Sequence, residues 1–210
     1  MPLPMVHLSV AHCLVQDHGH PASAAFYLGS IAPDAIHMRP GTEPKDKQTV
    51  HLVGPYGLRW ETLHALLAQG DPLATGYVVH VLTDQAWRAE IIRPFRGPRI
   101  EHMPYPELRT LYYNETDKLD FDLYDEQPWR PAVWALLRAA RAEDVGVEGE
   151  PPLLTAGEID AWRVRTLGWF DAHREKAGYQ PQVITRELVW PFIPETAAQI
   201  AAQLSDRSTS

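Results

Sequence analysis

Between its prolines and glycines, most of this chain places apolar residues at intervals of three and four, the spacing of an amphipathic helix. Few stretches show the alternation of apolar and polar residues that marks a half-buried strand. We therefore predict an all-α fold, a single-domain bundle of several helices. The expected helices cover residues 5–17, 21–28, 56–69, 72–92, 106–118, 128–143, 156–177 and 194–204.

Two stretches interrupt this spacing. Residues 30–55 combine six prolines and glycines with scattered charge, which predicts a long, irregular and functional loop. Residues 144–155 are interpreted as a surface loop, because one core needs helices from both sides of them. With 210 residues, 45% of them hydrophobic, the chain can bury one core, so we expect a single domain over 1–204 and a disordered tail at 205–210.

Charge and composition narrow the functional classes. A formal net charge of -8 repels nucleic-acid backbones, so no nucleic-acid partner is expected. Cys13 is the only cysteine and cannot form an internal disulfide. No apolar run approaches the ~18 to 20 residues of a membrane span, and the N-terminal stretch lacks the basic residues of a signal peptide. A cytoplasmic protein is expected, and its oligomeric state stays open.

The strongest chemical signal is His80-Val81-Leu82-Thr83-Asp84, in the middle of a predicted helix. A spacing of four places the imidazole and the carboxylate one turn apart on one face, where both can bind the same metal ion. The neighbouring residues are apolar, and an unpartnered carboxylate there would be costly. The alternative is a His-Asp pair that ties two helices together.

Three further residues extend this pattern, although each has an ordinary explanation by itself. Asp34 follows Pro33 and suits a turn or a helix cap, His51 ends the long loop, and His7 lies on the apolar face of the first helix. Together with His80 and Asp84 they make three histidines and two carboxylates. This is the nitrogen and oxygen ligand set that zinc and related divalent metals prefer.

The order of these residues resembles the zinc-dependent phospholipase C family, relatives of the bacterial phosphatidylcholine-cleaving enzymes. The resemblance covers about the first 90 residues. It is carried by the elements His7-x3-Ala11, Leu28-Gly29-Ser30-x2-Pro33-Asp34, Lys47-x3-His51 and Gly76-Tyr77-x2-His80-x3-Asp84-x2-Trp87. It implies an all-α fold of the phospholipase C and P1 nuclease type.

The resemblance also implies site roles. Asp34, His51, His80 and Asp84 would hold one zinc, and His7 would help to hold a second, with Asp84 bridging the two ions. Asp34 would also act as general base, so Asp34 and Asp84 are the expected catalytic residues. The family's third zinc has weaker matches here, and the candidates for it are His102, Glu115 and Asp117. One or two ions are therefore expected rather than three, and other divalent metals remain possible.

The expected activity is hydrolysis by metal-activated water. A divalent metal with an open coordination position lowers the pKa of bound water and polarises a phosphoryl oxygen, which favours a phosphoester substrate, either a lipid head group or a small soluble phosphate. Two alternatives stay open. The same chemistry could cleave an amide or ester bond, or the helical protein could be non-catalytic, with a structural or degenerate metal site.

Overall fold

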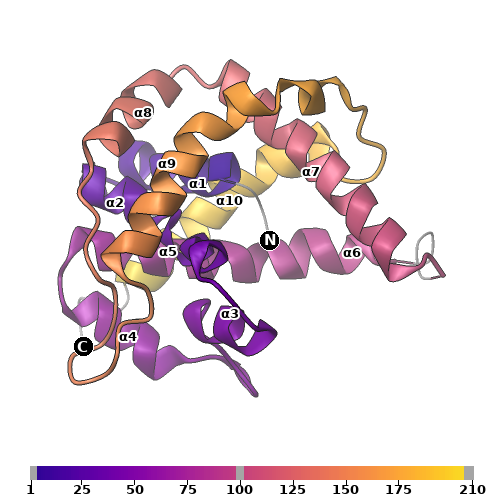
Figure 1. Cartoon of the computed structure of the whole chain (residues 1–210). Coiled ribbons are helices and arrows are strands. Elements are labelled where there is room, and N and C mark those ends of the chain that lie inside the picture. The colour runs from indigo at the N-terminus through magenta and orange to yellow at the C-terminus, as the bar shows by residue number, and fades with distance from the viewer. Residues whose placement is uncertain (1–3, 98–101, 206–210) are drawn as a thin grey trace. The chain divides into compact units, whose positions relative to one another are not determined.

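The computed structural model describes residues 4–97 and 102–205, and in them the chain is mostly helical (Figure 1). The prediction of an all-α fold is confirmed. The elements in order are α1 Pro4–Asp17, α2 Ala24–Gly29, the 3-10 helix η1 Ala32–Met38, α3 Pro44–Val50, β1 Val53–Gly54, β2 Gly57–Leu58, α4 Trp60–Ala68, α5 Pro72–Trp87, the π-helix η2 Arg88–Ile92, α6 Arg93–Phe95, α7 Tyr105–Glu126, α8 Arg130–Ala139, α9 Ala156–Ala172, the 3-10 helix η3 Arg174–Gly178 and α10 Arg186–Ser205.

The chain groups into two compact units. Among the described residues, unit 1 comprises 4–20, 82–97, 102–128 and 170–205, and unit 2 comprises 21–81 and 129–169. Helices α5 and α9 each continue from one unit into the other. The expectation of one domain over 1–204 stays a prediction.

In unit 1, α1 packs against α7 and α10, and η3 packs against α7. Buried aromatic rings fill this core: Phe170 stacks on Tyr124 at 4.1 Å between ring centroids and meets Phe121 edge-on at 5.1 Å. The backbone N–H of Met5, at the start of α1, donates to Asp120 Oδ1 on α7 at 2.8 Å. A buried carboxylate thus serves an N–H that the first turn of the helix leaves without a backbone partner.

In unit 2, α2 packs against α8, as Figure 1 shows. The last turn of α2 also approaches α5 closely, and both contact points are glycines. A Cβ added to Gly29 would lie 2.1 Å from the carbonyl oxygen of Leu73, and one added to Gly76 would lie 2.1 Å from that of Phe26. Only residues without a side chain allow this backbone approach.

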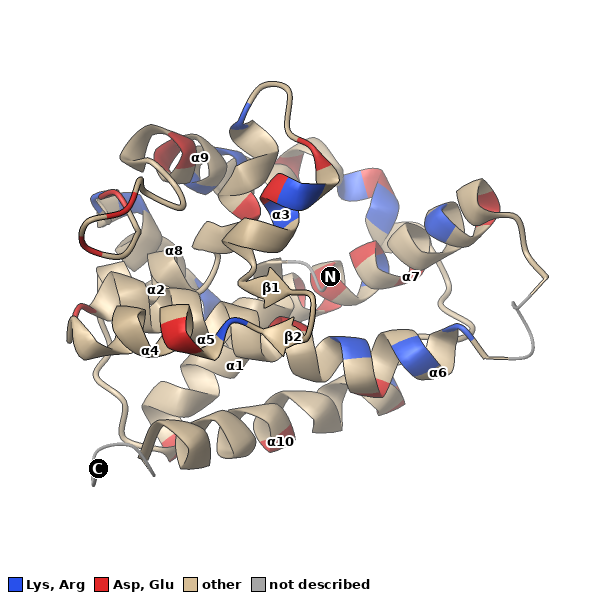
Figure 2. Cartoon of the chain, turned by 90° about the horizontal axis from the view of Figure 1, so that it is seen from below, with Lys and Arg blue, Asp and Glu red and all other residues tan. Residues whose placement is uncertain are grey.

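The expected irregular loop over 30–55 is wrong, because this stretch contains η1, α3 and β1. Strand β1 pairs with β2, which follows it directly, in a short antiparallel hairpin (Figure 2). Pro33 and Pro44 each lie in the first turn of a helix, where a missing N–H costs nothing. Glu43 and Asp46 form a capping box at the start of α3. These two prolines, which the sequence pattern assigns to a loop, therefore lie at the starts of helices. The hairpin also shortens the next helix, which begins at Trp60 rather than at residue 56.

Several helix ends differ from the expected ones. The helix expected to end before Pro94 passes through η2 into α6, and α7 extends eight residues beyond Lys118. Helix α10 starts at Arg186 and contains Pro191 and Pro194, and its buried residues Val189, Phe192 and Ile193 anchor the part that precedes and surrounds the prolines. Packing thus outweighs the local cost of proline. Ser205 ends α10, and the rest of the expected tail lies outside the described residues.

None of the helices in the described residues is both long and apolar enough to cross a bilayer.

Candidate metal centre

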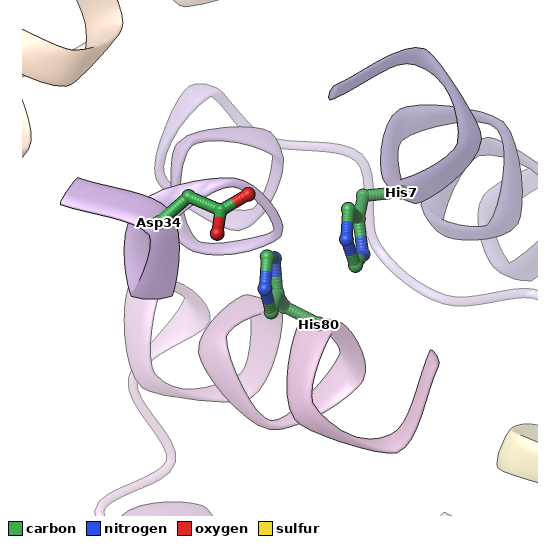
Figure 3. A group of neighbouring side chains, drawn as sticks. All are labelled: His7, Asp34 and His80. Carbon is green, nitrogen blue, oxygen red and sulfur yellow. The ribbon is translucent and has the colours of Figure 1, made fainter. Parts of the chain in front are cut away.

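Unit 2 brings together three of the predicted ligands, Asp34, His51 and His80. All three side chains are buried, with exposed fractions of 6%, 5% and 0%. His51 Nε2 lies 3.5 Å from Asp34 Oδ1, the rings of His51 and His80 are 5.5 Å apart at their centroids, and His80 offers a ligand atom within 4.8 Å of one on each of the other two. Figure 3 shows the side chains of Asp34 and His80 facing each other.

Asp34 reaches this position because η1 begins directly after α2. The chain leaves α2 at Ser30, whose backbone N–H still bonds to the carbonyl oxygens of Phe26 and Leu28, and Pro33 starts the next helical turn. Asp34 therefore lies in the first turn of η1, where a carboxylate is favoured. The Asp34 carboxylate is buried, and no Lys or Arg side chain in the described residues forms an ion pair with it.

A backbone carbonyl fixes the tautomer of His80. Its Nδ1 lies 2.9 Å from the carbonyl oxygen of Ser30. Since a carbonyl oxygen only accepts, Nδ1 carries the hydrogen, and in the neutral ring Nε2 then carries a lone pair. A ring with one nitrogen bonded to a backbone carbonyl and the other carrying a lone pair is typical of metal-binding histidines.

His51 has the same arrangement through a different element. It is the C-cap residue of α3, and its Nδ1 donates to the carbonyl oxygen of Lys47, one turn earlier, at 2.9 Å. The hydroxyl of the buried Tyr77 on α5 donates to the carbonyl oxygen of Val50, which ties α5 to the end of α3. The next residue, Leu52, is buried with a φ of +52°, an uncommon conformation for a residue with a side chain. The chain thus turns sharply after placing His51.

The cluster gathers three acceptors in a buried place. Nε2 of His51, Nε2 of His80 and Oδ1 of Asp34 all present lone pairs when the histidines are neutral, and Asp34 Oδ1 accepts no hydrogen bond of normal length from the described residues. Such groups repel one another unless a proton or a cation lies among them. Two ligands held 2.0–2.1 Å from a tetrahedral zinc are about 3.4 Å apart, close to the 3.5 Å between Asp34 and His51. The residues therefore fit a divalent metal.

The electrostatic surroundings keep Asp34 ionised. Burial raises the pKa of its carboxyl, but the contact with His51 and the positive charges of His80, His51 and His37 when protonated outweigh that effect and hold the pKa below its usual range. An ionised carboxylate is the form that binds a metal.

The other two predicted ligands, His7 and Asp84, belong to unit 1. His7 Nε2 on α1 lies 3.6 Å from Asp84 Oδ1 on α5, and the His7 side chain is buried. Figure 3 also draws His7. Asp84 follows His80 by one turn on the same continuous helix, as the spacing of four predicted. The pair can be a second ligand set or an ion pair with a protonated histidine.

The three weaker candidates have other surroundings, all in unit 1. Glu115 is fully buried and accepts hydrogen bonds of 2.5–3.2 Å from the backbone N–H groups of Gln182, Val183 and Ile184. Asp117 forms an ion pair with Lys176. His102 is exposed. Glu115 thus holds the segment before α10 in place, and the roles of all three as ligands stay predictions.

Sequence reasoning missed the backbone contacts that orient the ligands. The carbonyl groups of Ser30 and Lys47 have no side-chain signature. The spacing of four between Lys47 and His51 at the end of a helix is the one available signal, since it allows a C-terminal histidine to bond back to the preceding turn.

Comparisons of the chain with protein-family models, with curated proteins and with solved structures found no match.

Proposed function

We propose that this protein is a metal-dependent hydrolase of phosphoesters, with a divalent metal, most simply zinc, held by Asp34, His51 and His80. The observation that carries the proposal is the shared arrangement of the two histidines. Each gives its Nδ1 hydrogen to a backbone carbonyl and offers a ligand atom close to one on the buried Asp34 carboxylate. Two histidines that only filled a core would not need this same orientation beside one carboxylate.

Three protein ligands leave a coordination position open, which distinguishes a catalytic site from a closed structural one. A bound metal of this kind lowers the pKa of its water from 15.7 toward ~7 and polarises a phosphoryl oxygen. Asp34 has a second carboxylate oxygen besides Oδ1, and in the ionised form this oxygen can accept a proton from the attacking water. Burial of the ligands excludes competing water from their bonds.

His7 and Asp84 extend the proposal to a second ion. Asp84 follows His80 by one helical turn, and His7 Nε2 faces its carboxylate. A second ion held by this pair would supply the same activation of water and the same polarisation of a phosphoryl oxygen as the first. This arrangement, in a mostly helical chain, supports the resemblance to the zinc-dependent phospholipase C family, and the phospholipase C and P1 nuclease type of fold is part of the proposal.

The test is hydrolysis by the full chain, stripped with a chelator and reloaded with zinc. The substrates are bis(p-nitrophenyl) phosphate, a phosphodiester, and p-nitrophenyl acetate, a carboxylic ester. We expect zinc-dependent release of nitrophenol from the phosphodiester, and a loss of at least ~100-fold in His51→Ala. His64→Ala is the matched control, because His64 is an exposed histidine of the same unit whose ring contacts Trp60.

Cleavage of the acetate alone would favour the ester-hydrolase alternative. Zinc binding without cleavage of either substrate would favour a structural site. Equal activity in His51→Ala and in the unaltered protein would refute the proposed centre.

A further inference from the structure

A stripe of side chains runs along α9 within unit 2. Glu158, Trp162, Arg165 and Trp169 follow one another at spacings of four, three and four, so they share one face of the helix. The guanidinium of Arg165 lies over both indole rings, with its Cζ 5.8 Å from the Trp162 ring centroid and 5.5 Å from that of Trp169. The two rings hold the long arginine side chain in place.

The 3-10 helix η1 is attached to this face of α9. Arg39, the residue after η1, donates two hydrogen bonds to the Glu158 carboxylate, at 2.5 and 3.0 Å, and a third to the carbonyl oxygen of Leu153 at 2.9 Å. One turn further along α9, the ring of Trp162 lies 5.9 Å from the ring of His37. The bidentate Arg39–Glu158 pair thus fixes how η1 lies against the stripe.

Two strong donors on this face, the buried indole N–H of Trp162 and the exposed Arg165 guanidinium, have no acceptor within the described residues. The indole Nε1 of Trp162 is buried and makes no hydrogen bond in the described residues. Within the same residues, Arg165 forms only its two contacts with indole rings and no ion pair with a carboxylate. A buried N–H without an acceptor is costly, so an oxygen from water or from a bound ligand that reached it would remove this cost.

These donors lie next to the metal centre through η1. Side chains three residues apart in a 3-10 helix are eclipsed, so we expect His37 and Asp34 to share one face of η1.

We infer that His37, Trp162 and Arg165 form a subsite that binds the phosphate oxygens of the substrate beside the metal centre. This inference rests on the proposed function and adds the residues that position the ester. Arg165 supplies the positive charge and two parallel N–H groups, and Trp162 supplies one N–H in a fixed direction. An anionic phosphoester fits this set of donors, whereas a neutral amide leaves the arginine charge unpaired.

The first measurement is calorimetric titration of the full chain with inorganic phosphate, with and without one added equivalent of zinc. Arg165→Gln is expected to weaken phosphate binding by about 10-fold to 100-fold, and Trp162→Phe, which keeps the ring and removes the N–H, by about fivefold. Arg138→Gln is the matched control, since Arg138 is an exposed arginine of the same unit, on α8. A second titration uses a short-chain phosphatidylcholine below its micelle concentration.

Loss of binding in Arg165→Gln and Trp162→Phe, with unchanged binding in Arg138→Gln, supports the subsite. Tighter binding of the phospholipid than of phosphate identifies a lipid head group as the source of the phosphate, and the reverse order identifies a small soluble ester. If Arg165→Gln binds phosphate as the unaltered protein does, the inference fails. That failure is separate from the proposed metal centre, because zinc binding is measured in the same samples and does not require Arg165.

Discussion

Replacing Gly76 by alanine tests how the fold positions the metal centre. The glycine lies in α5, one turn before His80, and faces the last turn of α2. The same turn of α2 ends at Ser30, whose carbonyl orients His80. A methyl group at residue 76 therefore acts on stability and on the ligand at once.

The size of the effect follows from the contact distances. The added Cβ would lie 2.1 Å from the carbonyl oxygen of Phe26 and 2.8 Å from the backbone nitrogen of Ser30, while ordinary contacts begin near 3.4 Å. The two backbones must separate by about 1 Å, and no flexible side chain can absorb the shift. Overpacking of this kind costs ~1–3 kcal/mol or more, against a gain of ~1 kcal/mol in helix propensity. We expect a net loss of about 2 kcal/mol.

Thermal unfolding measures the first effect. For a chain of this length the melting temperature should fall by roughly 4–8 °C. Gly168→Ala is the control with the opposite sign: Gly168 lies inside α9 with no atom near its added Cβ, so the substitution should stabilise the protein by ~0.5–1 kcal/mol.

Zinc affinity measures the second effect. Moving the Ser30 carbonyl away from His80 Nδ1 should weaken zinc binding by ~10-fold to 100-fold, as loss of an orienting contact does at other metal sites. A competition titration with a chromogenic chelator gives this value. If Gly76→Ala has the same melting temperature as the unaltered protein and binds zinc as tightly, the close approach of α2 and α5 does not position the metal centre.

Three further predictions concern other parts of the chain. Glu115→Gln should destabilise the protein by about 3 kcal/mol in urea unfolding, because the buried carboxylate accepts backbone N–H groups from three residues; an unchanged midpoint would refute this role. Burial of the Glu158 carboxyl raises its pKa, but the hydrogen bond from Arg39 outweighs this and the pKa is lowered, so the stability it adds is present above the ordinary pKa and lost as the pH falls through the lowered value. Glu158→Gln should therefore show a weaker acid dependence of unfolding between about pH 5 and pH 3, and an identical profile would contradict the assignment. Burial raises the pKa of the Cys13 thiol to about 11, so alkylation by iodoacetamide at pH 8 should be about two orders of magnitude slower than for a free thiol, and equal rates would show that the thiol is accessible.

The elements that the sequence predicted best are long helices whose apolar residues recur at intervals of three and four. Helices α1 and α5 begin within one residue of the expected positions, and the spacing of His80 and Asp84 on α5 follows from helix geometry alone. The short helices η1 and α3 were missed, because their turns are held by caps and first-turn prolines rather than by an apolar face. A proline can lie in a loop or in the first turn of a helix. For Pro44, the capping partners Glu43 and Asp46 are the sequence signal that distinguishes the two.

The candidate site divides in the same way. Ligand types and order along the chain nominated Asp34, His51 and His80, and the structure places these three together. The contacts that orient them come from backbone carbonyls, which any residue supplies, so the sequence could not show them. Glu115 is a residue type that often binds metals, but its carboxylate accepts hydrogen bonds from backbone N–H groups instead. A buried carboxylate needs a partner, but the amino-acid sequence does not show whether that partner is a metal ion or a backbone N–H group.

The most direct test of the central claim is the metal content of the untagged protein, measured by inductively coupled plasma mass spectrometry after expression with added zinc. The Asp34→Asn, His51→Ala double variant is compared with His64→Ala and with the unaltered chain, and circular dichroism confirms that each is folded. We predict about one equivalent of zinc or more in the unaltered chain and in His64→Ala, and a large loss in the folded double variant. A folded, unaltered protein that contains no metal, or a double variant that retains all of it, would contradict the account.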